Sequence, residues 1–240
     1  MHTLVTLGLL AALGVALLLG LGIWQLERRV WKLDLIEQVD ARVHADPVPA
    51  PGASAWPTIT TDADQYLRVT ARGHFLNDKE TLVQAVTDLG SGFWVLTPLV
   101  TDQGSTVLIN RGFVPPDQRA PSSRVAGEIA GEAVVTGLLR ITEPGGGFLR
   151  SNDPEHDRWY SRDVAAIASA RQLDHVAPYF IDADGTPNPG GSPVGGLTVI
   201  SFPNNHLVYA LTWFVLAAML AGGAVYVGYD EWRFRKSYRQ

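Results

Sequence analysis

The first residues that could do chemistry lie at the start of the second of two long apolar stretches. His206 opens this stretch, and ionisable side chains at membrane depth are rare and default candidates for function. At helical spacing, the same side carries Tyr209, Ala210, Trp213 and Ala217. An imidazole beside aromatic rings and small residues suits an apolar planar ligand, with a neutral His nitrogen coordinating iron, as in many haem sites. The alternative places His206 and Tyr209 in the aromatic belt of a membrane helix, and spacing alone favours it.

Two arginines, Arg28 and Arg29, form a second candidate group directly after the first apolar stretch. Guanidinium groups bind carboxylates well, so these side chains would suit haem propionates. Long basic side chains at the end of a membrane helix also reach lipid headgroups by snorkelling. The sequence is equally compatible with propionate binding and with contact to lipid headgroups.

Several classes of chemistry are excluded by what the sequence lacks. The 240 residues contain no Cys, which rules out disulfides, CxxC redox sites, covalent c-type haem attachment and thiolate zinc sites. Met1 and Met219 are the only thioethers, too few for a methionine-rich copper relay. There is no Walker A, nucleotide-binding GxGxxG, HExxH or GxSxG motif.

His156 is the remaining candidate for acid–base or metal chemistry, because Asp153, Glu155 and Asp157 surround it. A solvated acidic turn started by Asn152-Asp153-Pro154 accounts for the same residues, and this interpretation is favoured. A membrane-anchored hydrolase that uses His156 is therefore only a third hypothesis, and we expect a protein that is not an enzyme.

The two apolar stretches, residues 4–24 and 206–229, are each long enough to cross a bilayer, which takes about 20 apolar residues in a helix. The first could also be a cleaved signal peptide. However, it lacks a basic leading region, its apolar run is too long, and no A-x-A-like cleavage site follows it. We expect two transmembrane helices and a multi-pass protein with both termini on one side.

The charges next to the spans give conflicting signals for orientation. A basic tail, residues 230–240, favours a cytoplasmic location for the tail. Arg28, Arg29 and Lys32, directly after the first span, instead favour a cytoplasmic location for the start of the loop. The tail carries Arg233, Arg235, Lys236 and Arg239. A loop of about 180 residues lies outside the range in which short-loop charges decide, so we follow the tail. Both termini are expected in the cytoplasm, with an acidic extracytoplasmic loop that argues against binding of nucleic acid.

After the first span, apolar residues continue at helical spacing through Trp31, Leu35 and Val39. Four prolines between residues 47 and 57 then interrupt the pattern. Residues 25–60 are therefore expected to form an amphipathic juxtamembrane helix followed by an extended, Pro-rich linker over residues 46–60.

Residues 61–205 consist of short apolar and β-branched runs separated by turn residues, as is typical of a β-rich domain. Strands are predicted at residues 66–75, 80–86, 93–100, 105–114 and 132–141, with two more at 178–182 and 197–201. Gly104 suits a hairpin turn at positive φ, and Asp163 could begin a helix over residues 163–172. The expected fold is a membrane protein with two transmembrane helices flanking a predominantly antiparallel β (α+β) extracytoplasmic domain.

The first span also carries small residues at four-residue intervals: Gly8, Ala12, Ala16 and Gly20. Such a ladder permits close approach of helices. Packing of the two spans against each other is the commoner explanation, and a groove for another membrane protein is the alternative.

Six segments occur in a specific order around the two terminal spans. They are GIWQLERRVWKLDLI (22–36), GHF (73–75), GSGFWVLTPL (90–99), INRGFVP (109–115), WYSRD (159–163) and NNHLVYALTWF (204–214). Together they resemble the Surfeit locus protein 1 family over nearly the whole chain. Phe113 stands where that family more often has Trp, which is a conservative departure.

The resemblance implies an assembly factor for haem-copper cytochrome c oxidase that delivers or stabilises haem a for insertion into subunit I. Bacterial members are thought to bind haem a through a histidine of the second span, and the matching residue here is His206. The resemblance therefore favours His206 as a haem ligand over the aromatic-belt role that spacing alone favours. Tyr209, Trp213, Arg28 and Arg29 complete the expected cofactor site. The implied partners are cytochrome c oxidase subunit I, haem a synthase and the lipid bilayer. No Arg- and Ser-rich transit segment precedes the first span, so a bacterial plasma membrane is expected.

The alternative within the same resemblance is a membrane scaffold that holds a maturing oxidase subunit without binding haem. Arg111, in the INRGFVP segment, is either a partner contact or part of a buried strand-end ion pair. The buried interpretation is favoured.

Overall fold

The computed structural model describes the backbone of residues 2–237 and the side chains of residues 5–234, 236 and 237. Arg239 and Met1, which entered the sequence arguments, lie outside the described residues. The chain divides into two compact units, one made of Met1–Gln38 with Ser201–Gln240 and the other of Val39–Ile200.

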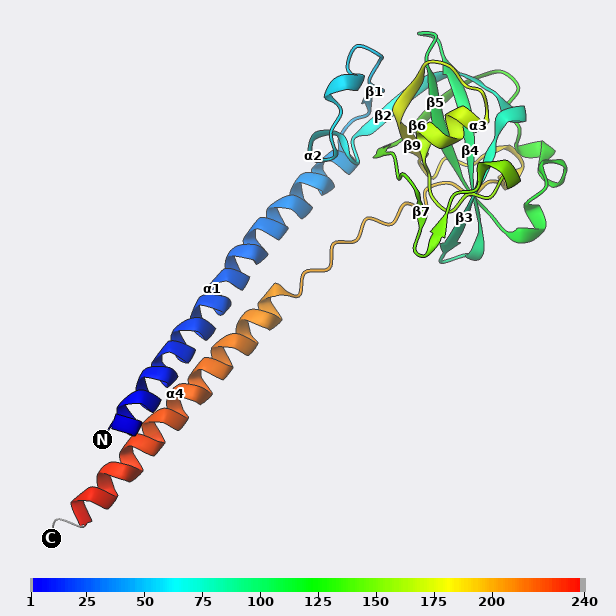
Figure 1. Ribbon diagram of the computed structural model, residues 1–240. Helices are drawn as coiled ribbons and strands as arrows, with labels where there is room; N and C mark the ends of the chain where they lie inside the picture. Colours follow the sequence, from blue (N-terminus) through cyan, green and yellow to red (C-terminus); the bar gives the residue numbers. More distant parts are fainter. Residues whose placement is uncertain (1, 238–240) are drawn as a thin grey trace. The chain divides into compact units, whose positions relative to one another are not determined.

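Two long helices form the first unit: α1, His2–His44, whose last residues belong to the second unit, and α4, His206–Ser237. Both are long and apolar enough to cross a membrane, as the sequence predicts. Figure 1 shows that α4 runs alongside α1 in the opposite chain direction. α1 continues without a break beyond residue 24, which confirms the predicted helical extension.

Close packing between α1 and α4 is made possible by two glycines of α1. A β-carbon at Gly14 would come within 2.8 Å of Leu220, and one at Gly22 would collide with the ring of Phe214. These glycines therefore let the backbone of α1 approach large side chains of α4, which is how small residues act at membrane-helix contacts.

The predicted small-residue ladder does not make this contact. Gly8 and Gly20 have open space where a β-carbon would stand, and Ala12 and Ala16 are exposed. The prediction that the ladder packs the two spans together is wrong, because spacing within α1 cannot show which of its faces α4 will cover.

The second unit is a β-barrel with additions at its edges. Its strands are β1 Val48–Pro49, β2 Arg68–Phe75, β3 Thr81–Thr87, β4 Gly90–Thr101, β5 Thr106–Val114, β6 Glu132–Ile141 and β9 Val176–Ala183. Their order is β1-β2-β6-β9-β5-β4-β3, and a further β2–β4 pairing closes the barrel. The β1–β2 and β5–β9 pairs are parallel and the others antiparallel, so the predominantly antiparallel prediction is confirmed.

Most of the predicted elements of this unit are confirmed. The five main strands exist, the candidate at 178–182 lies within β9, and Gly104 adopts a φ of 76° in the β4–β5 turn. Asp163 caps the short helix α3, Val164–Ala170, by accepting a hydrogen bond from the Ala166 N–H at 3.1 Å. The predicted strand at 197–201 is wrong: these residues pair with no strand, and Thr198 donates to Asp182 instead.

Two hydrophobic clusters hold the unit together. One fills the barrel with side chains such as Val69, Ile109 and Tyr179, and the other packs α3 and Trp159 on the outside. β5 is buried along its whole length because it contributes to both. Trp56, in a 3-10 turn just before α2 (Thr61–Asp64), packs against the barrel core, so part of the Pro-rich segment belongs to the compact unit.

Barrel closure explains one glycine in the GHF segment. β2 pairs with β6 along most of its length, and from Gly73 to Phe75 it also pairs with β4. A β-carbon at Gly73 would collide with the carbonyl group of Val100. Only glycine allows the two backbones to meet here.

Asp182 in β9 is a buried carboxylate with only 2% of its surface exposed. It links β9 to β5, to β6, to the segment before α3 and to the segment after β9. It accepts hydrogen bonds from Asn110 (2.7 Å), Arg140 (2.6 Å), Arg162 (3.2 Å) and Thr198 (3.0 Å). Arg162 also donates to Glu143 at 2.6 Å. Burial acts to lower the pKa of Arg162, but Asp182 and Glu143 raise it above its ordinary value.

Replacing Asp182 should therefore lower the stability of the barrel unit. Asp182→Asn leaves two nearly buried guanidinium groups short of a counter-charge, a change that costs about 3–5 kcal/mol when a buried pair is broken. We expect the Tm of the full chain in detergent, followed by tryptophan fluorescence, to fall by roughly 10 °C. The control is Glu132→Gln, which breaks the exposed Arg72–Glu132 pair (3.0 Å) and should cost less than about 1 kcal/mol. Equal Tm values for the two variants would contradict a central role for Asp182.

Candidate functional site

His206, the first residue of α4, makes a polar contact with the other long helix. Its Nδ1 lies 2.7 Å from Oε1 of Gln25 in α1. An amide oxygen can only accept a hydrogen bond, so Nδ1 donates and carries the proton. The neutral ring then has its lone pair on Nε2, and this is the nitrogen that can bind a metal.

Gln25 is a residue that the sequence interpretation missed. It lies in the same unit as His206 but 181 positions away in the chain, and it follows Gly22, where the ring of Phe214 packs against α1, by about one turn. The available signal was a polar, uncharged side chain at the end of an apolar span. That signal alone does not identify its partner.

The other predicted residues of α4 do not all lie on one face. Ala210 and Ala217 are buried and Trp213 is half-buried, on the same side as His206. Tyr209 is 56% exposed and lies outside this face. The structure therefore groups His206 with Trp213 and the two alanines, and leaves Tyr209 on the outer surface of the helix.

The two predicted arginines also differ from each other. Arg29 is half-buried and follows Gln25 by one turn on the same side of α1. Arg28 is exposed, and its guanidinium lies 3.9 Å from the centre of the Trp31 ring. Arg29 is thus the arginine closer to the face that carries Gln25.

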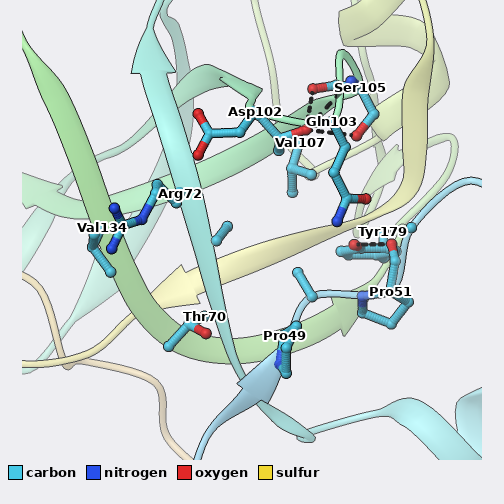
Figure 2. A pocket seen from close by; sticks show the side chains of 14 residues that line it. Pro49, Pro51, Thr70, Arg72, Asp102, Gln103, Ser105, Val107, Val134 and Tyr179 are labelled. Carbon is cyan, nitrogen blue, oxygen red and sulfur yellow. Dashed lines mark hydrogen bonds between the residues drawn. The ribbon is translucent and has the colours of Figure 1, made fainter.

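The β-barrel unit has a pocket of about 270 Å³ at one end, between the residues after β1 and the β4–β5 turn. Figure 2 shows the hydroxyl of Tyr179 pointing to Pro51, where it donates to the carbonyl oxygen at 2.7 Å. Burial raises the pKa of Tyr179, so this hydroxyl stays protonated and acts as a donor. The residues that line the pocket include no histidine, and its one tyrosine hydroxyl is engaged with Pro51.

The acidic residues around His156 do not converge on one point. His156 Nδ1 lies 2.9 Å from Asp153, and this exposed contact lowers the pKa of Asp153. Asp157 instead accepts from the indole N–H of Trp159 (2.7 Å) and from Arg171 (2.6 Å). Among the described residues, no three His, Asp or Glu side chains are placed to hold a metal ion.

Arg111 is buried, as favoured, but its hydrogen-bond partners are neutral oxygens. It donates to the carbonyl of Gly127 and, at 2.8 Å, to Oδ1 of Asn188, and it lies over the ring of Phe75. Burial lowers the pKa of this guanidinium. Arg111 therefore ties together the segments that follow β5 and β9.

Comparison with known proteins matches most of the chain to one family. The sequence model of the SURF1 family matches residues 12–218. Surfeit locus protein 1 of Rattus norvegicus is 40% identical over 215 residues, which cover 83% of this chain and 68% of the rat protein. The Homo sapiens protein of the same name is 39% identical over 216 residues, or 83% of this chain and 70% of the human protein. A SURF1-like protein of Monosiga brevicollis is 38% identical over 216 residues, or 83% and 79%.

The contact between the helices should depend on Gly22 and not on Gly20. We expect Gly22→Leu to separate α1 from α4, because the new side chain occupies the space of Phe214, whereas Gly20→Leu enters open space. Since the chain has no Cys, spin labels at Leu9→Cys and Val225→Cys can report the helix separation. Double electron–electron resonance should show a broader, longer distance distribution for Gly22→Leu only. The same distribution in both variants would contradict the packing described here.

Proposed function

This chain belongs to the SURF1 family, and from that membership we propose that it binds or stabilises haem a for insertion into subunit I of a haem-copper cytochrome c oxidase. The family is known for cytochrome c oxidase assembly factors. The observation that carries the haem proposal is the His206–Gln25 hydrogen bond, in which Nδ1 donates to Gln25, so that the lone pair of a neutral ring lies on Nε2.

The residues around His206 have donor chemistry that fits a haem cargo. Imidazole is a common axial ligand of haem iron, and a second group that holds its other nitrogen orients such ligands. Trp213 supplies apolar aromatic surface, and Tyr209 adds an exposed ring one turn after His206. In this proposal the guanidinium groups of Arg29 and Arg28 bind the propionates.

The proposed role is that of a chaperone and needs no catalytic step. Iron held by one protein ligand can be passed on more readily than iron held by two. Haem a synthase is the proposed source of the cargo and oxidase subunit I the proposed recipient, both in the lipid bilayer. The proposed location is a bacterial plasma membrane. The basic tail favours an orientation with both termini in the cytoplasm and the β-barrel outside it.

Substitution of His206 tests the ligand. We expect the full chain, purified after coexpression with haem a synthesis enzymes, to show a haem a spectrum in reduced-minus-oxidised difference measurements. His206→Ala should lose the axial ligand and most of this haem. His156→Ala is the matched control, because that imidazole is exposed in the barrel unit and pairs with Asp153 in a turn. Haem content that is unchanged in His206→Ala would exclude His206 as the ligand.

Gln25 provides a second test with a finer readout. Gln25→Leu removes the acceptor for Nδ1 and should weaken haem retention by roughly 10-fold, as loss of such a supporting hydrogen bond does at metal sites. Gln25→Glu keeps an acceptor at this position and should retain the haem spectrum. If leucine and glutamate at position 25 behaved alike, Gln25 would have no role in orienting His206.

The scaffold alternative is favoured by one observation, the exposed small-residue ladder of α1, which α4 leaves uncovered. A ladder of this kind suits close packing of a partner's helix. If the scaffold alternative holds, haem is incidental, and Gly20→Leu should abolish oxidase assembly in cells while the haem content of the purified chain is unchanged. Normal oxidase assembly in this variant would remove the support for the alternative.

A further inference from the structure

A short hairpin of the barrel unit presents two large apolar side chains to solvent. Strands β7, Gly146–Gly147, and β8, Arg150–Ser151, are joined by Phe148 and Leu149. Phe148 is 91% exposed and Leu149 88%, the two highest values among the large apolar side chains that the structure describes. Such side chains contribute nothing to the hydrophobic clusters of the unit.

The backbone conformation at this hairpin tip is also unfavourable for a leucine. Leu149 has a φ of 56°, in the left-handed region. Two-residue hairpin loops usually place Gly, Asn or Asp in such positions, because a larger side chain is strained there. Neither local backbone preference nor core packing accounts for a leucine, and a departure of this kind is a reason to look for a function.

Beneath the tip lies a groove of about 590 Å³ that combines apolar rings with a fixed cation. Its lining includes Phe93, Phe148 and Tyr160, and none of its lining residues is acidic although the chain as a whole has a net charge of −5. Arg150 donates to Gln84 at 2.8 Å, and its guanidinium lies 5.4 Å from the centre of the Tyr160 ring. The positive charge is thus held close to the exposed apolar tip.

We propose that the Phe148–Leu149 tip, together with Arg150, docks on the phospholipid surface of the bilayer that α1 and α4 span. This inference rests on the membrane insertion of both helices, which is part of the proposed function. Aromatic and aliphatic side chains enter the headgroup region, and a neighbouring cation binds lipid phosphate.

Two features favour lipid over a protein as the occupant. Both ends of the barrel unit continue into candidate spans. With both helices inserted, as proposed, this unit stays tethered to a bilayer surface. A tip of two residues is also far too small to form a stable protein interface, which buries upward of about 1,000 Å². Interfacial insertion of a unit that is already anchored requires no such area.

The absence of Cys allows a direct test in the full chain. Leu149→Cys, labelled with the environment-sensitive dye NBD, is reconstituted into nanodiscs of phosphatidylcholine with phosphatidylglycerol. We expect the NBD emission to rise by roughly twofold over detergent solution, with quenching by lipids that carry a nitroxide near the headgroup. Val125→Cys, also exposed in the barrel unit but outside the groove, should keep a water-like signal. Arg150→Gln should reduce the effect at position 149 mainly in the discs that contain phosphatidylglycerol.

Three results would overturn the proposal in distinguishable ways. A water-like signal at position 149 while NBD at Val225→Cys in α4 is quenched by nitroxide-labelled lipid would exclude lipid docking and leave membrane insertion intact. Loss of quenching at both positions would contradict membrane insertion, and with it the proposed function. A signal at position 149 that changes only in membranes containing oxidase subunits would assign the tip to a protein partner instead.

Discussion

The packing of α4 against α1 places the candidate site, and the contact of the Phe214 ring with Gly22 is part of that packing. A β-carbon at this position would collide with the ring of Phe214, so glycine lets that ring pack directly against the backbone of α1. This contact brings the first residue of α4 to the end of the apolar part of α1, and His206 meets Gln25 there. The imidazole obtains a hydrogen-bond partner, and with it a defined tautomer, from the packing of two helices that are far apart in sequence.

The barrel unit is held together by a separate, buried network of ion pairs and hydrogen bonds around Asp182. Asp182 joins side chains from β5 and β6, the segment before α3 and the segment after β9. Burying Arg140 and Arg162 would be unfavourable in isolation, and the carboxylates of Asp182 and Glu143 offset that cost. The same network explains why residues 197–201, although rich in β-forming side chains, form no strand. Their polar link to Asp182 is made by Thr198, and the preceding glycines turn the chain.

Periodicity and turn chemistry predicted the elements well because those signals are local. The strand ending at Phe75, the Gly104 turn and the Asp163 cap all depend on residues within a few positions of one another. Contacts between distant segments were not predictable in this way. Helical spacing identified the ladder that includes Gly20 but not the packing role of Gly22, and it marked His206 without finding Gln25. Choosing between faces of a helix requires knowledge of its neighbour, which neither helix encodes alone.

In the proposed function, Gln25 holds the proton of His206 on Nδ1, and Nε2 is then the nitrogen that binds haem iron. Nitrogen-15 NMR of the full chain, with labelled histidine and a His206→Ala spectrum for assignment, measures this directly. We expect a neutral ring protonated at Nδ1 in the haem-free protein, and loss of the Nε2 resonance when haem a is added. A ring protonated at Nε2, or an Nε2 resonance unaffected by haem a, would contradict it.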